Sequence, residues 1–511
     1  MMREVRTRFA PSPTGGLHLG GVRTALYSYL FAKKHQGKFI LRIEDTDQNR
    51  YVSGAEQYIV DCLAWCGLSP DEGPHIGGEH APYRQSERKE SYKQYALQLV
   101  ESGHAYYAFD TTEELEKMRE DFKSTQNPSP QYDHTTRMKM KNSLTLTNEE
   151  VKQLLAINTP YVIRISMPAN ETISFTDMIR GEIKNDSNLV DDKVLLKADG
   201  MPTYHLAVVV DDYLMKISHA FRGEEWLPSV PVHILLWKYL GWENDMPHWA
   251  HLPLILKPDG HGKLSKRDGD RLGFPVFAMD WHDDKTNETI KGFKELGFLP
   301  EAFINLLALL GWHSGEEKEL FTKEEMIVAF SMERVHKGGA KFDYEKAKWF
   351  NHEWIKGLPA KTLMPSMQTI LLSADIPLKD EPFLLDVITL VKDRCVFLND
   401  IVMQSSYFFQ APIAIDFDAI KPKWADDKAL FFSELIHQFS QLDTWEMQGI
   451  EETFKTLATE KNIKVGELQF LFRMILVGAK FGPGVFDIAY KIGKEETQSR
   501  IQYLLQKIGT V

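Results

Sequence analysis

The sequence predicts an α/β fold in which an inserted domain splits a Rossmann-type, parallel-sheet catalytic domain, followed by an all-α C-terminal domain. A strand, a glycine-rich turn, a helix and a second strand follow one another within the first 43 residues, the order that opens a parallel sheet. Strand-like apolar segments resume near Val194. After about Leu320 the apolar residues recur at helical spacing, as in Phe383–Val391 and Leu468–Leu476.

The first part of this sheet is predicted at the N-terminus. Val5–Ala10 alternates apolar and polar residues and stops at Pro11, as a strand does. After Gly21 the apolar spacing predicts a helix, which we expect Gly37 to end at the C′ position. Lys38–Ile43 predicts the second strand. The turn after the first strand would then lie at the carboxyl end of the sheet, where ligands bind in such folds.

From about Tyr106 the composition changes, which predicts an insertion. Glu113–Lys123 predicts a charged helix, and Tyr161–Ser166 and Ile173–Phe175 predict strands. The expected domains are 1–105 (catalytic, first half), 106–190 (insertion), 191–255 (catalytic, second half), 256–345 (a loop and a small domain) and 346–511 (helical domain).

Bulk properties restrict the function classes. At 511 residues the chain is too long for one core, and with 43% hydrophobic and 26% charged residues it is typical of soluble globular proteins. We expect no membrane span and no signal peptide, because the apolar runs are short. Cys62, Cys66 and Cys395 lack disulfide or metal-ligand spacing, which favours core packing and a cytoplasmic location. The net charge of −12 argues against nonspecific binding to nucleic acid, although residues 1–50 hold nine Lys or Arg against four Asp or Glu.

Two segments carry candidate chemistry. In RFAPSPTGGLHLGG (8–21), glycines at a strand-to-helix turn let a ligand approach the backbone, and a histidine there can donate to a phosphate oxygen. In KLSKR (263–267), two lysines flank a serine and form a flexible cationic clamp suited to phosphoryl chemistry. Taken singly, an ordinary glycine turn and a solvated basic loop remain open as readings of these segments.

Taken together, the two segments resemble the paired signatures of class I aminoacyl-tRNA synthetases. Further blocks are similar to glutamyl-tRNA synthetase and occur in that family's order: LRIEDTDQNRY (41–51), DEGP (71–74), PYRQSER (82–88), DGMPTYHLAVVVDD (199–212), FRGEEW (221–226), GFLPEA (297–302), LLGW (309–312) and ERVHKGGAKFD (333–343). The C-terminal part resembles the helical anticodon-binding region of bacterial members, on weaker motifs.

The resemblance implies a two-step reaction at one site. The α-carboxylate of glutamate attacks the α-phosphorus of ATP and releases pyrophosphate, and the terminal ribose of tRNA-Glu then attacks the mixed anhydride. It implies catalytic roles for His18, Lys263 and Lys266, and ATP contacts from Thr14, His18, Gly20, Gly21, Leu264, Ser265 and Lys266. It implies glutamate contacts from Arg8, Ala10, Ser12, Glu44, Tyr204 and Arg222, with Arg8 on the side-chain carboxylate and Glu44 on the ammonium. The tRNA-binding candidates are Arg50, Arg84 and Arg394.

The resemblance also implies cofactors and partners. Mg²⁺ would arrive with ATP. The insertion would bind the tRNA acceptor end and the domain at 256–345 the stem. The partners would be tRNA-Glu, L-glutamate and ATP, with no membrane, and the protein would be a monomer. Some relatives carry a cysteine-rich zinc site in the insertion, but residues 96–190 contain no cysteine, so we expect no zinc and no other protein-held metal.

Two departures from the family pattern stand out. Val208 occupies a position that is often asparagine, so a side-chain amide contact is lost or comes from another group. The segment Asp268–Leu296 looks longer than usual, so the clamp loop could differ in shape.

Other readings stay open at this point. Arg8 and Arg222 could form surface ion pairs, Glu44 could cap a helix, and Tyr204 could be a core aromatic residue. The chain could also charge glutamine or acylate tRNA-Gln, act as a small-molecule nucleotidyltransferase, or be a noncatalytic tRNA-binding scaffold.

Overall fold

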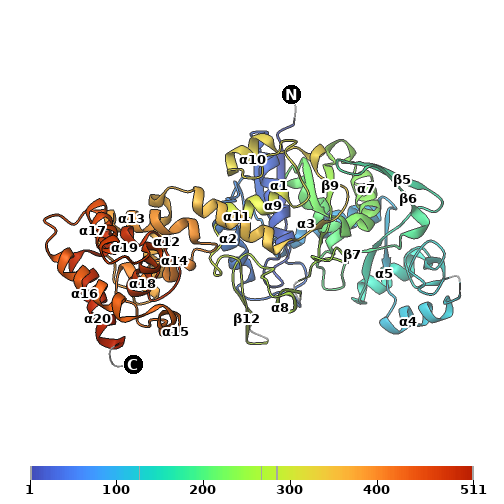
Figure 1. Ribbon diagram of the computed structural model, residues 1–511. Helices are drawn as coiled ribbons and strands as arrows, with labels where there is room; N and C mark the ends of the chain where they lie inside the picture. Colours follow the sequence, from blue (N-terminus) through green and yellow to red (C-terminus); the bar gives the residue numbers. More distant parts are fainter. Residues whose placement is uncertain (1–2, 126, 266–267, 284–285, 509–511) are drawn as a thin grey trace. The chain divides into compact units, whose positions relative to one another are not determined.

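The computed structural model describes residues 3–125, 127–265, 268–283 and 286–508. The chain divides into two compact units. The first combines Met1–Glu295 with Phe303–Tyr344 and contains the sheets; the second combines Leu296–Ala302 with Glu345–Val511 and is built from helices (Figure 1).

The strands are β1 (Arg6–Phe9), β2 (Lys38–Leu41), β3 (Ala105–Ala108), β4 (Val162–Ile165), β5 (Thr172–Asp177), β6 (Gly181–Asp186), β7 (Val194–Leu196), β8 (His219–Gly223), β9 (His248–Leu252), β10 (Ile255–Leu256), β11 (Trp281–Asp283), β12 (Glu288–Ile290) and β13 (Ala340–Lys341).

The helices up to residue 329 are α1 (Leu19–Lys34), α2 (Ala55–Trp65), α3 (Lys89–Glu101), α4 (Thr112–Asp121), α5 (Asn148–Ala156), α6 (Tyr204–Leu214), α7 (Val230–Tyr239), α8 (Asp268–Leu272), α9 (Pro300–Leu309) and α10 (Lys323–Ala329). Those that follow are α11 (Tyr344–Gly357), α12 (Ala360–Ser373), α13 (Glu381–Val391), α14 (Asp400–Ser405), α15 (Phe417–Ile420), α16 (Asp426–Ser440), α17 (Met447–Glu460), α18 (Val465–Val477), α19 (Val485–Ile492) and α20 (Lys494–Ile508).

The central sheet has the strand order β2-β1-β8-β9-β5-β6. Neighbours from β2 to β5 run parallel, and β6 returns antiparallel at the edge. The chain leaves the sheet after β2, and β8 later pairs with β1, so the predicted parallel sheet with an intervening segment is confirmed. Strands β5 and β6 lie inside the range expected for the insertion, yet they extend the central sheet (Figure 1).

A second sheet, β3-β4-β7, forms the base of the insertion. It packs into the same apolar cluster as α6, α7 and β9, with Ile163, Leu195, Val209 and Trp237 among the buried members. The insertion therefore shares a core with the catalytic sheet at its base. Beyond this base, Tyr106, Ala108, Met118 and Tyr132 form a small cluster.

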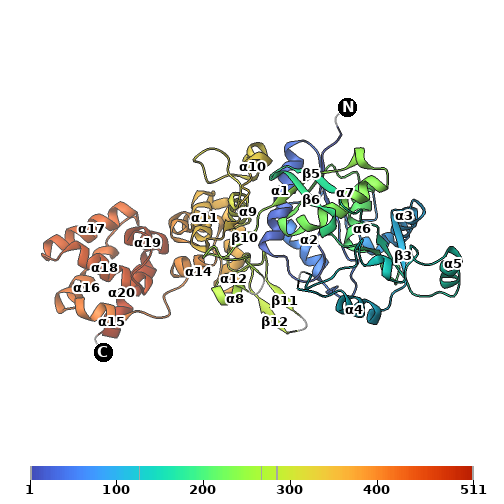
Figure 2. The same ribbon diagram turned by 90° about the vertical axis from the view of Figure 1, so that its right-hand side faces the viewer.

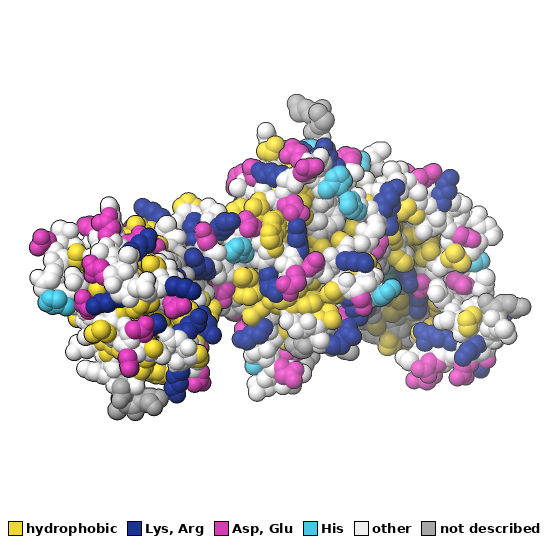
Figure 3. Space-filling model, in the orientation of Figure 1, with side chains coloured by type: hydrophobic (Ala, Val, Ile, Leu, Met, Phe, Trp, Pro, Cys, Tyr) yellow, Lys and Arg dark blue, Asp and Glu magenta, His cyan; other side chains and the backbone are white. Residues whose placement is uncertain are grey.

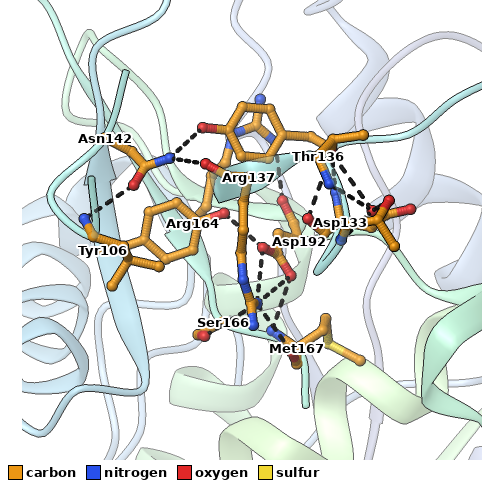
Figure 4. Close-up of polar contacts among 12 residues, drawn as sticks. Tyr106, Asp133, Thr136, Arg137, Asn142, Arg164, Ser166, Met167 and Asp192 are labelled. Atoms are coloured by element: carbon orange, nitrogen blue, oxygen red, sulfur yellow. Dashed lines mark hydrogen bonds and ion pairs between the residues drawn. The ribbon is translucent and has the colours of Figure 1, made fainter. Parts of the chain in front are cut away.

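Residues 127–147 of the insertion contain one short 3₁₀ helix, Arg137–Lys139, and a polar network stabilises the coil around it (Figure 4). Asp192 is fully buried and accepts hydrogen bonds from the Tyr106 hydroxyl (2.6 Å), the Met167 N–H (2.9 Å) and Arg137 Nη1 (3.2 Å to Oδ2). Asn142 Nδ2 donates to the Arg137 carbonyl at 2.6 Å. Because buried polar groups are costly without partners, these bonds stabilise one conformation of the coil.

The first helix ends differently from the sequence expectation. Gln36, not Gly37, has the left-handed φ of 54°, so the predicted role of Gly37 is wrong. A Cβ atom at Gly37 would lie 2.0 Å from the carbonyl oxygen of Val5, which is far inside contact distance. Glycine is needed here because the start of β2 passes close to the chain before β1.

A buried carboxylate joins strands β1 and β2 to the loop after α2. Arg6 binds both oxygens of Glu72, at 2.9 and 3.0 Å, and Lys38 and Tyr83 also bind this carboxylate. Burial works to raise the pKa of Glu72, but the hydrogen bonds from Arg6, Tyr83 and Lys38 outweigh it and hold the pKa at about 2. The ionised form is thus favoured by folding.

The ion pair between Arg6 and Glu72 makes the unfolding free energy depend on pH. A depressed pKa contributes stability above the unfolded value of about 4.5, and that stability is lost as the pH falls toward 2. We expect the difference in unfolding free energy between the wild type and Glu72→Gln to shrink by about 2 kcal/mol from pH 7 to pH 3. Urea unfolding at a series of pH values measures it; a difference that stays constant would show that Glu72 has the same pKa in both states.

The second unit is built around an aromatic core. Phe431, Phe439, Phe454 and Phe472, from α16, α17 and α18, are fully buried. Asn351 on α11 accepts a hydrogen bond from Leu299 N–H and donates to the Gly297 carbonyl, which attaches Leu296–Ala302 to this unit. The predicted all-α C-terminal domain is confirmed. Among the described residues, no helix is both long and apolar enough to cross a membrane.

Candidate active site

A cavity of about 560 Å³ opens at the carboxyl ends of β1, β8 and β9 in the first unit. Its lining includes Arg8, Ala10, Ser12, Thr14, His18, Gly20, Gly21, Glu44, Arg50, Tyr204, Arg222, Lys263, Leu264 and Ser265. The structure thus brings together both signature segments, although more than 200 residues separate them. Lys266, predicted to be catalytic, lies outside the described residues.

Arg222, near the end of β8, is held by three neutral acceptors. Its Nε donates to His251 Nε2 at 2.9 Å, and its Nη1 is bonded to the Tyr204 hydroxyl at 2.8 Å and His233 Nδ1 at 3.2 Å. The buried Nη2 has no partner among the described residues, and none of their carboxylates forms an ion pair with Arg222. A fixed cation with one buried, unpaired N–H group therefore lies in the wall of the cavity, which is suited to binding an anion.

A chain of alternating charges lies beside Arg222. Asp212 Oδ1 accepts from Arg8 Nε at 3.1 Å and from Arg42 Nη1 at 2.7 Å, and Arg42 Nη2 donates to Glu44 Oε1 at 3.0 Å. Arg8 Nη1 donates to the Phe221 carbonyl at 3.1 Å, and its Nη2 makes no hydrogen bond to another described residue. Asp212 thus fixes the position of Arg8, and Arg42 fixes that of Glu44.

Glu44 supplies a carboxylate to the cavity. Burial raises its pKa, and the neighbouring Arg42 and Arg8 oppose this effect. One of its oxygens binds Arg42, which leaves the other to bind a substrate cation.

Tyr204 is the first residue of α6. Its hydroxyl accepts the hydrogen bond from Arg222, and its ring packs against the ring of Trp226, with the two centroids 4.4 Å apart. Trp226 also lines the cavity. Val208, one turn further along α6, is buried in the apolar cluster.

His18 is the N-cap of α1, and its side-chain Nδ1 accepts a hydrogen bond from the Gly20 N–H at 3.1 Å. In the neutral imidazole this leaves the proton on Nε2, so the ring can donate from that atom. Gly20 and Gly21 also line the cavity at the start of the helix. The turn thus combines backbone that lines the cavity, a helix N-terminus and an imidazole donor, the combination that favours phosphate.

The segment after α8 packs against this turn. Leu19 N–H donates to the Val276 carbonyl at 3.0 Å, and His18 pairs with Phe277 as an isolated antiparallel bridge. A Cβ at Gly16 would lie 2.7 Å from the Phe277 ring. Beyond this contact the segment forms the β11–β12 hairpin, which Figure 1 and Figure 2 show extending from the first unit.

The KLSKR loop is anchored at its described residues. Leu264 is buried, and the Ser265 N–H and hydroxyl both donate to Asp268 Oδ2, at 2.9 and 2.6 Å. Lys263 Nζ forms an ion pair with Glu225 Oε1 at 2.5 Å. Both members of this pair are partly exposed, so a polyanionic ligand can compete for Lys263.

Comparisons with known proteins identify the family. The family model for the catalytic domain of class I tRNA synthetases (E and Q) matches residues 4–349, and an anticodon binding domain model matches residues 354–505. The glutamate–tRNA ligase of Amoebophilus asiaticus is 51% identical over 511 residues, covering 100% of both chains. The chain belongs to the glutamate–tRNA ligase family.

Other members of this family agree with that assignment. The glutamate–tRNA ligase of Flavobacterium psychrophilum is 51% identical over 98% of this chain and 99% of its own. The solved structure of the glutamate tRNA ligase from Elizabethkingia meningosepticum, in complex with its amino acid, has a TM-score of 0.93 at 48% identity and covers 99% of both chains. The resemblance inferred from the sequence blocks is confirmed.

The three arginines expected to contact tRNA have different surroundings. Arg50 lines the cavity, is largely exposed and pairs with Asp47 at 2.5 Å. Arg84 lies outside the cavity lining, and its charge is compensated by Glu56 and Glu87. Arg394, in the second unit, is exposed, and its Nη1 donates to the Leu390 carbonyl at 3.3 Å.

Sequence reasoning missed several residues that shape this ligase-family site. Arg42 and Asp212 fix Arg8 and Glu44, and Glu225 holds Lys263. A signal existed for two of them: Arg42 and Glu44 stand two residues apart in a strand-like block, and Asp212 follows a run of valines on an apolar helix. A carboxylate on a buried helix face requires a cationic partner.

Proposed function

We propose that the protein ligates L-glutamate to the 3′ end of tRNA-Glu in two steps, through a glutamyl adenylate, with release of pyrophosphate and AMP. The observation that carries the proposal is the pair of arginine edges in the cavity. Arg222 and Arg8 each present Nη2 without a hydrogen-bond partner among the described residues, beside the single carboxylate of Glu44. Two cations and one anion complement the two carboxylates and the ammonium of glutamate.

The substrate residues have distinct proposed roles. Arg8 binds the side-chain carboxylate, and Glu44 binds the ammonium. Arg222 and Tyr204 complete the pocket, and Ala10 and Ser12 add backbone or hydroxyl contacts. Glutamine would present an uncharged amide in place of the carboxylate and so lose the charge attraction to Arg8, which means that these roles favour glutamate.

The signature residues would act on ATP. His18 Nε2–H donates to the phosphates as charge develops, and Thr14, Gly20, Gly21, Leu264 and Ser265 surround the nucleotide. Lys263, and Lys266 beyond the described residues, would neutralise the departing pyrophosphate. We propose that Mg²⁺ arrives with ATP. Because residues 96–190 contain no cysteine, we also propose that the fold needs no zinc.

tRNA recognition would rest on local basic surface despite the net charge of −12. Figure 3 shows both signs of charge over the face in view, with several Lys and Arg side chains gathered on the helical unit. We propose Arg50 and Arg84 as phosphate contacts and Arg394 as a base-reading residue in the anticodon domain. We also propose that the protein acts in the cytoplasm as a monomer.

Pyrophosphate exchange with glutamate or glutamine, with and without tRNA, tests the function. We expect exchange with glutamate in the presence of tRNA-Glu; exchange with glutamine, or none with glutamate plus tRNA, would refute the assignment. Charging of tRNA-Gln as well as tRNA-Glu would identify a non-discriminating enzyme. Nucleotidyl transfer to a small acceptor without tRNA would instead indicate a small-molecule nucleotidyltransferase. An unchanged KM and kcat for glutamate in Arg8→Ala would remove Arg8 from the pocket.

A further inference from the structure

We propose that Asp177 and His251 are positioning residues for the proposed glutamate ligation: they hold the Arg222 guanidinium so that its unpaired edge is directed to the substrate. Asp177 ends β5 and His251 lies in the neighbouring strand β9. Both are fully buried at the side chain, and neither is in the cavity lining. They therefore act on the substrate through Arg222, and the inference rests on the proposed function.

The hydrogen bonds fix one tautomer of His251. Arg222 Nε can only donate, so His251 Nε2, 2.9 Å away, must accept. The proton then resides on Nδ1, which donates to Asp177 Oδ2 at 2.6 Å. A protonated His251 would place two donors face to face, so the arrangement needs a neutral imidazole and an ionised carboxylate.

The backbone holds Asp177 in turn. Its Oδ1 accepts from the N–H groups of Ile179 and Arg180, at 2.9 and 3.0 Å, and its Oδ2 accepts from the His251 N–H at 3.0 Å. Burial works to raise the pKa of Asp177, but its hydrogen bond from His251 and those from the two turn N–H groups leave the pKa lowered. Burial lowers the pKa of His251, which Asp177 opposes. Both shifts favour the protonation states that the geometry requires.

The contacts of Arg222 show that it is held in place but keeps its positive charge. Its Nε and Nη1 donate to three uncharged acceptors, two imidazole nitrogens and a phenol oxygen. These bonds orient the guanidinium without neutralising its positive charge. An ion pair to a carboxylate would fix the side chain equally well but would compete with the substrate. The nearest carboxylate in this chain of contacts, Asp177, is separated from Arg222 by the imidazole.

The relay, by which we mean the hydrogen-bonded chain from Asp177 through His251 to Arg222, also joins the inserted segment to the cavity. Asp177 lies in the part of the chain between β4 and β7, and the turn that follows it places Arg180 in an ion pair with Glu224, two residues after Arg222. Asp177, at the end of β5, therefore reaches Arg222 through His251, and Arg180, in the turn after β5, pairs directly with the residue that follows β8.

Two substitutions at one position test the relay. Asparagine at 251 can donate to Asp177 but has no atom at the Nε2 position, whereas glutamine can place its carbonyl oxygen there to accept from Arg222. With tRNA-Glu present, we expect His251→Asn to raise the KM for glutamate about tenfold with the KM for ATP unchanged, and His251→Gln to restore most of the loss. His219→Asn is the matched control, because His219 is a largely buried histidine at the start of β8 that contacts Ser218.

The possible outcomes distinguish a failure of the positioning role from misfolding of the variant and from a failure of the proposed function. Equal glutamate KM values for His251→Asn and the control, or no gain from glutamine, would overturn the proposal. If His251→Asn does not fold, ¹⁵N-histidine NMR of the intact wild type decides: a neutral Nδ1–H tautomer at His251 supports the relay, and an Nε2–H tautomer overturns it. If the wild type transfers no glutamate, the proposed function fails, and with it the positioning role, even where the tautomer is the expected one.

Discussion

Arg222→Leu is expected to lower kcat/KM for glutamate about a thousandfold, with little change in the KM for ATP. In the proposed complex the two substrate carboxylates would lose one of the two arginines that face them in a buried pocket, a loss worth about 4 kcal/mol. Because Arg222 has no carboxylate partner of its own among the described residues, its substitution leaves no protein anion unpaired. Steady-state aminoacylation with each substrate varied in turn measures the effect.

Arg3→Leu provides the control for this experiment. Arg3 also binds neutral acceptors, the carbonyl oxygens of Asp245 and Ile217, but it precedes β1, at the amino end of the sheet and outside the cavity. We expect kcat/KM for glutamate to stay within about twofold of the wild type. A similar loss in both variants would mean that Arg222 acts through general stability, and an unchanged Arg222→Leu enzyme would remove Arg222 from the pocket.

The membership of the pocket could be predicted from the sequence, but its internal contacts could not. Arg8, Glu44 and Arg222 each stand in a recognisable block, so their convergence follows from the parallel sheet and its carboxyl edge. The three acceptors of Arg222 lie 18 residues before it and 11 and 29 residues after it, and Asp177 lies 74 residues before His251. No local pattern encodes such pairings, because they depend on which strands become neighbours.

The sequence pattern predicted the wrong role for Gly37 and did not predict the partner of strand β5. A glycine after a helix suggested a left-handed C′ residue, but Gln36 takes that conformation and Gly37 is required by the approach of Val5. Likewise, the strand signal at Ile173–Phe175 was correct, but the sequence did not reveal that β5 would pair with β9. In both cases the deciding contact is tertiary.

The buried arginines in and around the cavity differ in how their charges are balanced. Arg8 and Arg42 share Asp212, and Arg88 is paired with Asp211 at 2.7 Å. Arg222 alone among these arginines has no carboxylate partner among the described residues. The protein thus pairs the buried Arg8 and Arg42 with an anion and leaves Arg222 without one, so removing this buried anion should affect folding more than removing a surface anion.

Asp212→Asn is therefore expected to lower the unfolding free energy of the first unit by about 3–5 kcal/mol. The substitution leaves two buried guanidinium groups, Arg8 and Arg42, without their shared counter-ion. Burial works to raise the pKa of Asp212, but Arg8 and Arg42 hold it below its usual value, so the carboxylate is ionised at neutral pH. Hydrogen exchange of peptides from residues 4–60 as a function of urea reports on this unit separately from the helical one.

Glu182→Gln is the matched control, because Glu182 pairs with Lys184 at 3.4 Å with both side chains mostly exposed. Surface pairs contribute about 0–1 kcal/mol, so this variant should unfold within that range of the wild type. If the unfolding free energy falls by the same small amount in both variants, solvent must reach Asp212, and Asp212 is then not needed as the buried counter-ion of Arg8 and Arg42. If only Asp212→Asn is destabilised, its glutamate KM should rise as well, because Arg8 then loses the carboxylate that fixes its position in the pocket.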